Sequence, residues 1–135
     1  MNRLPAINFW AVLVAAVVAF VASAAWYIAF SKQRAALSPA AAAIGGRPQV
    51  TQMVLELARN LVVAFVLAYI VEHIGITTAA RAAALGLLLW IGFPLILLTG
   101  SIMYEKVPWR LAAIHAGDWL IKLLVIPIIT AIWRR

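Results

Sequence analysis

Three ionisable residues, His115, Asp118 and Lys122, lie within a hydrophobic stretch, residues 111–133, that is long enough to cross a membrane. Their spacing places all three on one face of a helix. Asp and Lys near the centre of a span each cost about 2.5 to 3.5 kcal/mol on an insertion scale. This face is therefore expected to meet other helices or a wet cavity, and its residues are candidates for a functional site.

A second polar group lies at a similar depth in an earlier apolar stretch, residues 53–76. There Glu56 and Asn60 share a helix face, with Arg59 beside them. If successive spans alternate in direction, these residues lie about 6 to 12 Å below one membrane surface. The ionisable face of the last stretch then lies about 6 to 17 Å below the same surface. The two groups are expected to meet.

We expect this meeting to form a polar pocket between the two stretches. Asp118 is expected to contact Arg59 or Lys122, and Glu56 to contact Arg59 or His115. Three aromatic residues at the same level complete the predicted pocket: Trp26, Tyr27 and Tyr104. The alternative is an ion-paired network that holds the helices together and binds nothing. Interhelical hydrogen bonds average only about 0.6 kcal/mol, which is a weak reason to keep three ionisable residues on one span.

Composition identifies a membrane protein, since 67% of the 135 residues are hydrophobic and only 11% are charged. Soluble domains have roughly 45 to 50% apolar and 25% charged residues. The predicted fold is all-α, a polytopic membrane protein with four transmembrane helices in an up-down bundle. It is predicted as a single membrane domain, 1–135, with spans at 7–30, 53–76, 78–98 and 111–133 and a long connection over 31–52.

Two features of the spans predict how they pack. Gly92-Phe93-Pro94 and Pro127 are expected to bend the third and fourth spans, because proline removes a helical donor and clashes with the preceding turn. Small residues recur at every fourth position in the first span, at Ala11, Ala15, Ala19 and Ser23. Such a seam lets another helix approach closely. A second small-residue face is offered by Ala79, Ala83 and Gly86.

The eleven Lys and Arg residues are scattered and mostly flank apolar runs. They are expected to mark membrane surfaces, and no nucleic-acid partner is predicted. Four cations lie on the side of the termini and five on the side of the long connection. This difference favours a cytoplasmic connection with both termini outside, in a multi-pass protein of the cell (inner) membrane.

The sequence offers little support for catalysis. Cysteine is absent, which excludes disulfides and thiolate chemistry, and the only two histidines, His73 and His115, belong to opposite surfaces. No known catalytic motif occurs, so no catalytic residue, metal or cofactor is predicted. His115 with Asp118 has the groups for general acid–base chemistry on a lipophilic substrate, but it lacks a nucleophile.

Three segments together resemble one family: Ala25-Trp26-Tyr27, Trp90-Ile91-Gly92-Phe93, and Tyr104-Glu105-Lys106-Val107-Pro108-Trp109-Arg110. The chain is similar over essentially its whole length to the bacterial integral-membrane family catalogued as domain of unknown function 1761. The resemblance implies a small four-helix inner-membrane protein without an assigned activity, and it adds no mechanism.

Three functions follow from these observations. The first is binding or transport of a small polar or cationic solute, or a lipid headgroup, in the pocket between the second and fourth spans. The second is an accessory or scaffold subunit of a larger membrane complex, docked through its small-residue faces. The third and least favoured is a membrane enzyme. The expected partners are the lipid bilayer and either further copies of the chain or a larger complex.

Overall fold

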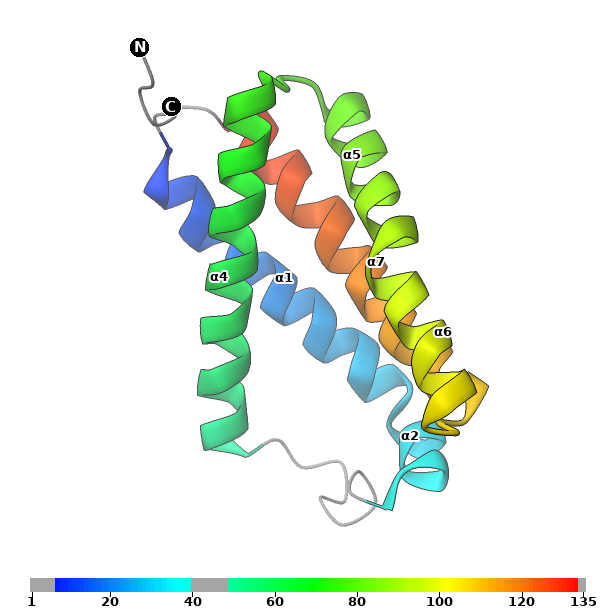
Figure 1. Cartoon of the computed structure of the whole chain (residues 1–135). Coiled ribbons are helices and arrows are strands. Elements are labelled where there is room, and N and C mark those ends of the chain that lie inside the picture. The colour runs from blue at the N-terminus through cyan, green and yellow to red at the C-terminus, as the bar shows by residue number, and fades with distance from the viewer. Residues whose placement is uncertain (1–6, 40–48, 134–135) are drawn as a thin grey trace.

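The structure is a computed structural model, and it describes residues 7–39 and 49–133. Its long spans are α1 (Phe9–Ala29), α4 (Val50–Ile74), α5 (Ala79–Gly92) joined to α6 (Pro94–Tyr104), and α7 (Trp109–Ile132). Each is long and apolar enough to cross a membrane. Successive spans alternate in direction, so α1 begins and α7 ends at the same end of the bundle (Figure 1). The predicted all-α, four-span up-down bundle is confirmed.

Local capping sets where these helices begin and end. The side chain of Asn8 accepts hydrogen bonds from the backbone N–H groups of Trp10 and Ala11, and starts α1. Gly75 ends α4 in the left-handed conformation, at φ +82°, which glycine adopts at little cost. The Thr78 hydroxyl then caps α5. These caps produce the short turn between the second and third spans.

The third span is broken at Phe93, where α5 meets α6. Pro94 has no backbone N–H, so it cannot continue the helical bonding of α5 and instead starts α6. The span extends to Tyr104, past residue 98 where the sequence predicted its end. Thr99 and Ser101 do not interrupt the helix, because both hydroxyls donate to carbonyl oxygens of the preceding turn.

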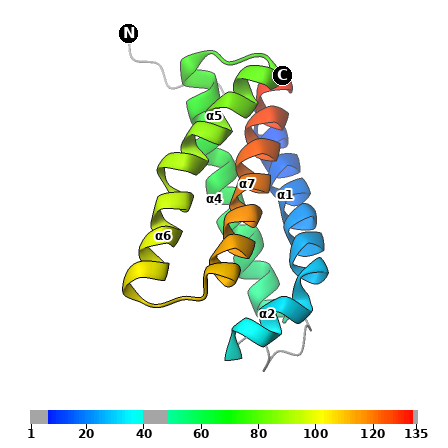
Figure 2. The ribbon, with the colours of Figure 1, turned by 90° about the vertical axis from the view of Figure 1, so that its right-hand side faces the viewer.

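α7 is the central helix of the bundle and the most buried of the four spans. It packs against α1, α4, α5 and α6, and also against the short helix α2 (Ser31–Leu37) (Figure 2). α5 follows α4 through a tight turn, yet its main partner is α7.

A close approach of backbones joins α5 to α7. A side chain at Gly86 would collide with the carbonyl group of Leu123. This carbonyl lacks its usual helical partner, because the residue four positions on is Pro127. The hydroxyl of Thr130 supports α7 next to Pro127, because it donates to the carbonyls of Ile126 and Pro127. Proline and glycine therefore act together at this crossing.

The predicted small-residue seam of α1 lies inside the bundle. Its four members, Ala11, Ala15, Ala19 and Ser23, are all buried. The core around the seam is formed by α1, α4 and α7 residues, including Ala64, Leu67, Leu123 and Ile126. The seam is thus used within the chain and is not available to dock another protein.

Candidate functional site

Asp118 is the centre of a polar network inside the bundle. It lies on α7 and is only 3% exposed. Its Oδ1 accepts a hydrogen bond from the Ser23 hydroxyl of α1. Its Oδ2 lies 3.2 Å from the Tyr27 hydroxyl, which donates to it, and 3.0 Å from the Nζ of Lys122. Three donors therefore satisfy this buried carboxylate.

Lys122 joins α7 to α4. It is also 3% exposed, and its Nζ lies 2.8 Å from Oε1 of Glu56. The same ammonium lies 5.0 Å from the centre of the Trp119 ring, within cation–π distance. One ammonium is thus held between two carboxylates from two different spans.

Glu56 connects the buried part of the network to its exposed edge. The other oxygen of its carboxylate, Oε2, lies 2.9 Å from the Arg59 guanidinium. The Glu56 side chain is 30% exposed and that of Arg59 is 67% exposed. From Arg59 through Glu56 and Lys122 to Asp118, the charges alternate in sign and balance. This balance offsets much of the cost of placing charges within membrane spans.

The network continues from Asp118 toward α2. The Tyr27 hydroxyl lies 2.8 Å from Nδ1 of His115. Since this hydroxyl has one proton and donates it to Asp118, its oxygen accepts from His115, which places the imidazole proton on Nδ1. The guanidinium of Arg34, on α2, lies 4.3 Å from the centre of the Tyr27 ring. The network thus spans four helices.

The structure brings most of the sequence-predicted site residues together. Two predicted contacts are present, between Asp118 and Lys122 and between Glu56 and Arg59. The bridge from Glu56 to Lys122 was not predicted, nor were the roles of Ser23 and Arg34. The position of Ser23 on the small-residue seam is the signal that could have identified it, because that seam faces inward.

Three other predicted pocket residues lie outside the ionic network. Asn60 is 1% exposed, and its Nδ2 has no hydrogen-bond partner within the described residues. The Trp26 indole donates to the carbonyl of Ile114 at 2.8 Å, so it anchors α1 to α7. Tyr104 is 83% exposed and is not among the residues that the hydrogen bonds and ion pairs of the network join.

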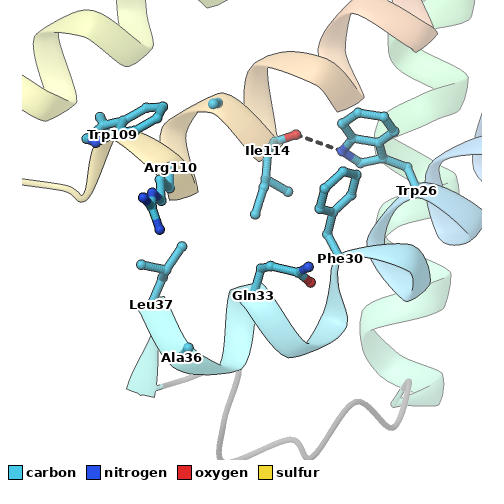
Figure 3. A pocket seen from close by; sticks show the side chains of 9 residues that line it. Trp26, Phe30, Gln33, Ala36, Leu37, Trp109, Arg110 and Ile114 are labelled. Carbon is cyan, nitrogen blue, oxygen red and sulfur yellow. Dashed lines mark hydrogen bonds between the residues drawn. The ribbon is translucent and has the colours of Figure 1, made fainter.

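A cavity of about 480 Å³ lies near this network. It is not between α4 and α7, where a pocket was predicted. It lies between α2 and the first turns of α7 (Figure 3). Its lining is mostly apolar and aromatic, with Gln33 and Arg110 as polar members. The ionic network itself is closed around its own paired groups.

In the described part of the chain, no three His, Asp or Glu side chains are placed so that they could hold a metal ion together. His73 lies near the end of α4, at the opposite end of the bundle from His115. The donors available around Asp118 are instead hydroxyls and an ammonium, which favour hydrogen bonding and ion pairing.

Fold and network together define a four-span membrane protein with buried ionisable groups. The chain belongs to the family described as protein of unknown function (DUF1761), which matches residues 10–131. This match confirms the resemblance seen in the sequence. No curated protein and no solved structure matches the chain.

Proposed function

We propose that this protein binds a small cationic solute within the membrane, at the position that the Lys122 ammonium occupies in this structure. One observation carries the proposal. Two carboxylates from different spans, Glu56 and Asp118, converge on a single ammonium at 2.8 and 3.0 Å. A site that holds the ammonium of a lysine has the charge and geometry to hold the ammonium of a solute.

The remaining contacts allow Lys122 to be replaced. Glu56 keeps Arg59 as a partner, and Asp118 keeps the hydroxyls of Ser23 and Tyr27. Each carboxylate therefore keeps a hydrogen-bonding partner when Lys122 leaves, and the solute ammonium replaces the shared buried cation. A lysine ammonium is a point charge on a flexible stem, so it can leave its partners by rotation about several bonds.

Access to the proposed site is from the surface on which α4 begins. Glu56 and Arg59 are the exposed members of the network and lie in the first three turns of α4. Toward the opposite surface the path is filled by the packed core of α1, α4 and α7. Transport of the solute across the membrane requires these three helices to separate.

The complete pairing of charges in the ionic network favours a second function, that of a scaffold. Every ionised group that is buried in the network has a partner, as expected of a network that only holds α1, α4 and α7 together. On this alternative the protein is a scaffold or accessory subunit. The α5 and α6 surface, which is the least buried of the spans, would then face a partner.

Alkylammonium binding distinguishes the two functions. Purified protein in zwitterionic nanodiscs is titrated calorimetrically with methylammonium and propylammonium. We expect saturable binding that weakens at least tenfold in Glu56→Gln and Asp118→Asn. Lys122→Met removes the competing ammonium and is expected to bind the probes more tightly. Glu72→Gln, near the far end of α4, is the matched control and is expected to bind like wild type.

The scaffold function is favoured instead if neither wild type nor Lys122→Met binds either probe saturably. Uptake into proteoliposomes tests transport separately. Uptake of methylammonium that is the same in wild type, Glu56→Gln and Asp118→Asn would exclude transport through this site.

We further propose that the protein lies in the cell membrane, with both termini outside and the segment 31–52 on the cytoplasmic side. The support is the small excess of Lys and Arg on the side of that segment.

A further inference from the structure

The cavity between α2 and α7 differs chemically from the ionic network. Its walls are built largely from apolar and aromatic side chains, namely Trp26, Phe30, Leu37, Trp109 and Ile114. Arg110 is the one charged residue that lines it, and its guanidinium extends into the space between α7 and α2 (Figure 3). No carboxylate belongs to the lining. The cavity is therefore an apolar groove with a cation at its edge.

Arg110 is available to a ligand. Across residues 7–39 and 49–133, the structure pairs it with no carboxylate, and its recorded contact is with the Trp109 ring, 5.5 Å from the guanidinium carbon. Outside the ionic network, the same end of the bundle carries Lys32, Arg34 and Lys106 against the carboxylate of Glu105 in the described residues. The field at the groove is thus positive, which complements an anionic group.

The groove lies at one end of the apolar spans. α1 ends and α7 begins at this level, where the length of helices able to cross a membrane places one surface of a bilayer. Trp26 and Trp109 match the aromatic residues that typically lie at headgroup level. The volume of about 480 Å³ is within the usual range for small-molecule sites, roughly 300 to 1,000 Å³.

We propose that this groove binds one acyl chain of an anionic phospholipid, with the phosphate of the headgroup beside Arg110. The acyl chain fills the space between α2 and α7, and the guanidinium forms charge-assisted hydrogen bonds to the phosphate oxygens. This site uses different residues from the proposed cation site. Either proposal can fail without the other.

Competition between two lipids tests the proposal. Purified protein in detergent is mixed with equal amounts of phosphatidylglycerol and phosphatidylcholine of matched chain length, and retained lipids are counted by native mass spectrometry. We expect about a fivefold preference for phosphatidylglycerol, which corresponds to the usual attraction of one basic residue to an anionic lipid. Arg110→Gln is expected to lose this preference.

Matched variants separate the groove from general effects of charge and surface. Arg81→Gln removes a cation at the opposite end of the bundle and is expected to keep the preference. Ala113→Phe fills the groove from α7 and is expected to lower retention of both lipids at least threefold. Ala84→Phe, exposed on α5, is expected to retain both as wild type does.

Three results would overturn the proposal. One is equal retention of the two lipids by the wild type. Another is an equal loss of preference in Arg81→Gln and Arg110→Gln, which would indicate a net-charge effect. The third is unchanged lipid retention in Ala113→Phe. If the oligomeric mass of Ala113→Phe changes at the same time, the occupant of the groove is a second copy of the chain. Because Arg110 is exposed, Arg110→Gln is expected to fold, and its lipid preference tests the proposal even if Ala113→Phe does not fold.

Discussion

Lys122 places a charged ammonium inside a membrane span, where it is buried between two carboxylates. We expect Lys122→Met to lower the free energy of unfolding by about 3 to 5 kcal/mol, since it leaves two carboxylates facing each other without their shared cation. Equilibrium unfolding in mixed micelles measures this change. Arg59→Gln, which removes an exposed partner of Glu56, is expected to cost less than about 1 kcal/mol.

Substitutions that include Lys122 also test whether the ion pairs of the network depend on one another. Replacing the whole set, as Glu56→Gln with Asp118→Asn and Lys122→Met, removes the uncompensated charges, so it is expected to recover at least half of the stability lost in Lys122→Met. Additive losses across the three substitutions would show that the ion pairs in the network do not interact.

Tyr27 provides a spectroscopic reading of the network. Its hydroxyl bridges His115 and Asp118, and Tyr27→Phe is expected to cost about 1 kcal/mol because Asp118 keeps Ser23 and Lys122. The protein has only two histidines, so ¹⁵N-histidine spectra resolve each one. The Nδ1 signal of His115 is expected to shift in Tyr27→Phe, and that of His73 to stay unchanged. An unchanged His115 signal would contradict the bridge.

At the scale of residues, the sequence predicted most of the network correctly because two physical rules are strong. Ionisable groups deep within a span face the interior of the bundle, and residues of alternating spans share depth when counted from the same surface. The pairing of Glu56 with Lys122 was missed because it depends on side-chain reach and on the exact height of α4 against α7. Neither quantity is encoded in local spacing.

At the scale of elements, the crossing of α5 with α7 depends on Gly86. Gly86→Ala is expected to destabilise the protein by about 1 to 3 kcal/mol, because the added methyl group meets the Leu123 carbonyl. Gly100→Ala is the matched control in α6, where a methyl group would have no neighbour within 4 Å. It is expected to be neutral or to stabilise by up to about 1 kcal/mol. Equal effects in thermal unfolding would contradict the close approach.

Elements also explain what sequence reasoning could not supply. The sequence predicted the existence and direction of each span from apolar length, and it predicted a bend at Pro94. The exposure of individual α6 residues was not predictable, because beyond the break it depends on how α6 packs against α5 and α7. Tyr104 was expected in the pocket from its position along the span, and it is 83% exposed.

At the scale of the whole molecule, the small-residue seam of α1 is buried within the bundle, so it is not a surface through which further chains can associate. Ala11, Ala15 and Ala19 are almost completely buried, and Ala15 and Ala19 belong to the core that α1 shares with α4 and α7. Any oligomer or larger complex must then form through outward faces, and the span made of α5 and α6 is the least buried of the four. Oligomerisation is therefore expected to leave the ionic network undisturbed.

Membrane orientation is the property of the whole molecule that most affects the proposed cation site, because the exposed edge at Glu56 and Arg59 opens toward one surface only. The chain lacks cysteine, so single cysteines report orientation cleanly. Thr77→Cys lies in the turn between α4 and α5, and Glu105→Cys follows α6 at the other end of the bundle.

With both termini outside, a membrane-impermeant maleimide added to intact cells is expected to label Thr77→Cys at once and Glu105→Cys only after permeabilisation. The cation site would then open to the cytoplasm, and a solute bound there would come from inside the cell. The reverse labelling pattern would contradict the charge argument, since five cations against four is a small excess. It would also direct the search for the solute to the outside of the cell.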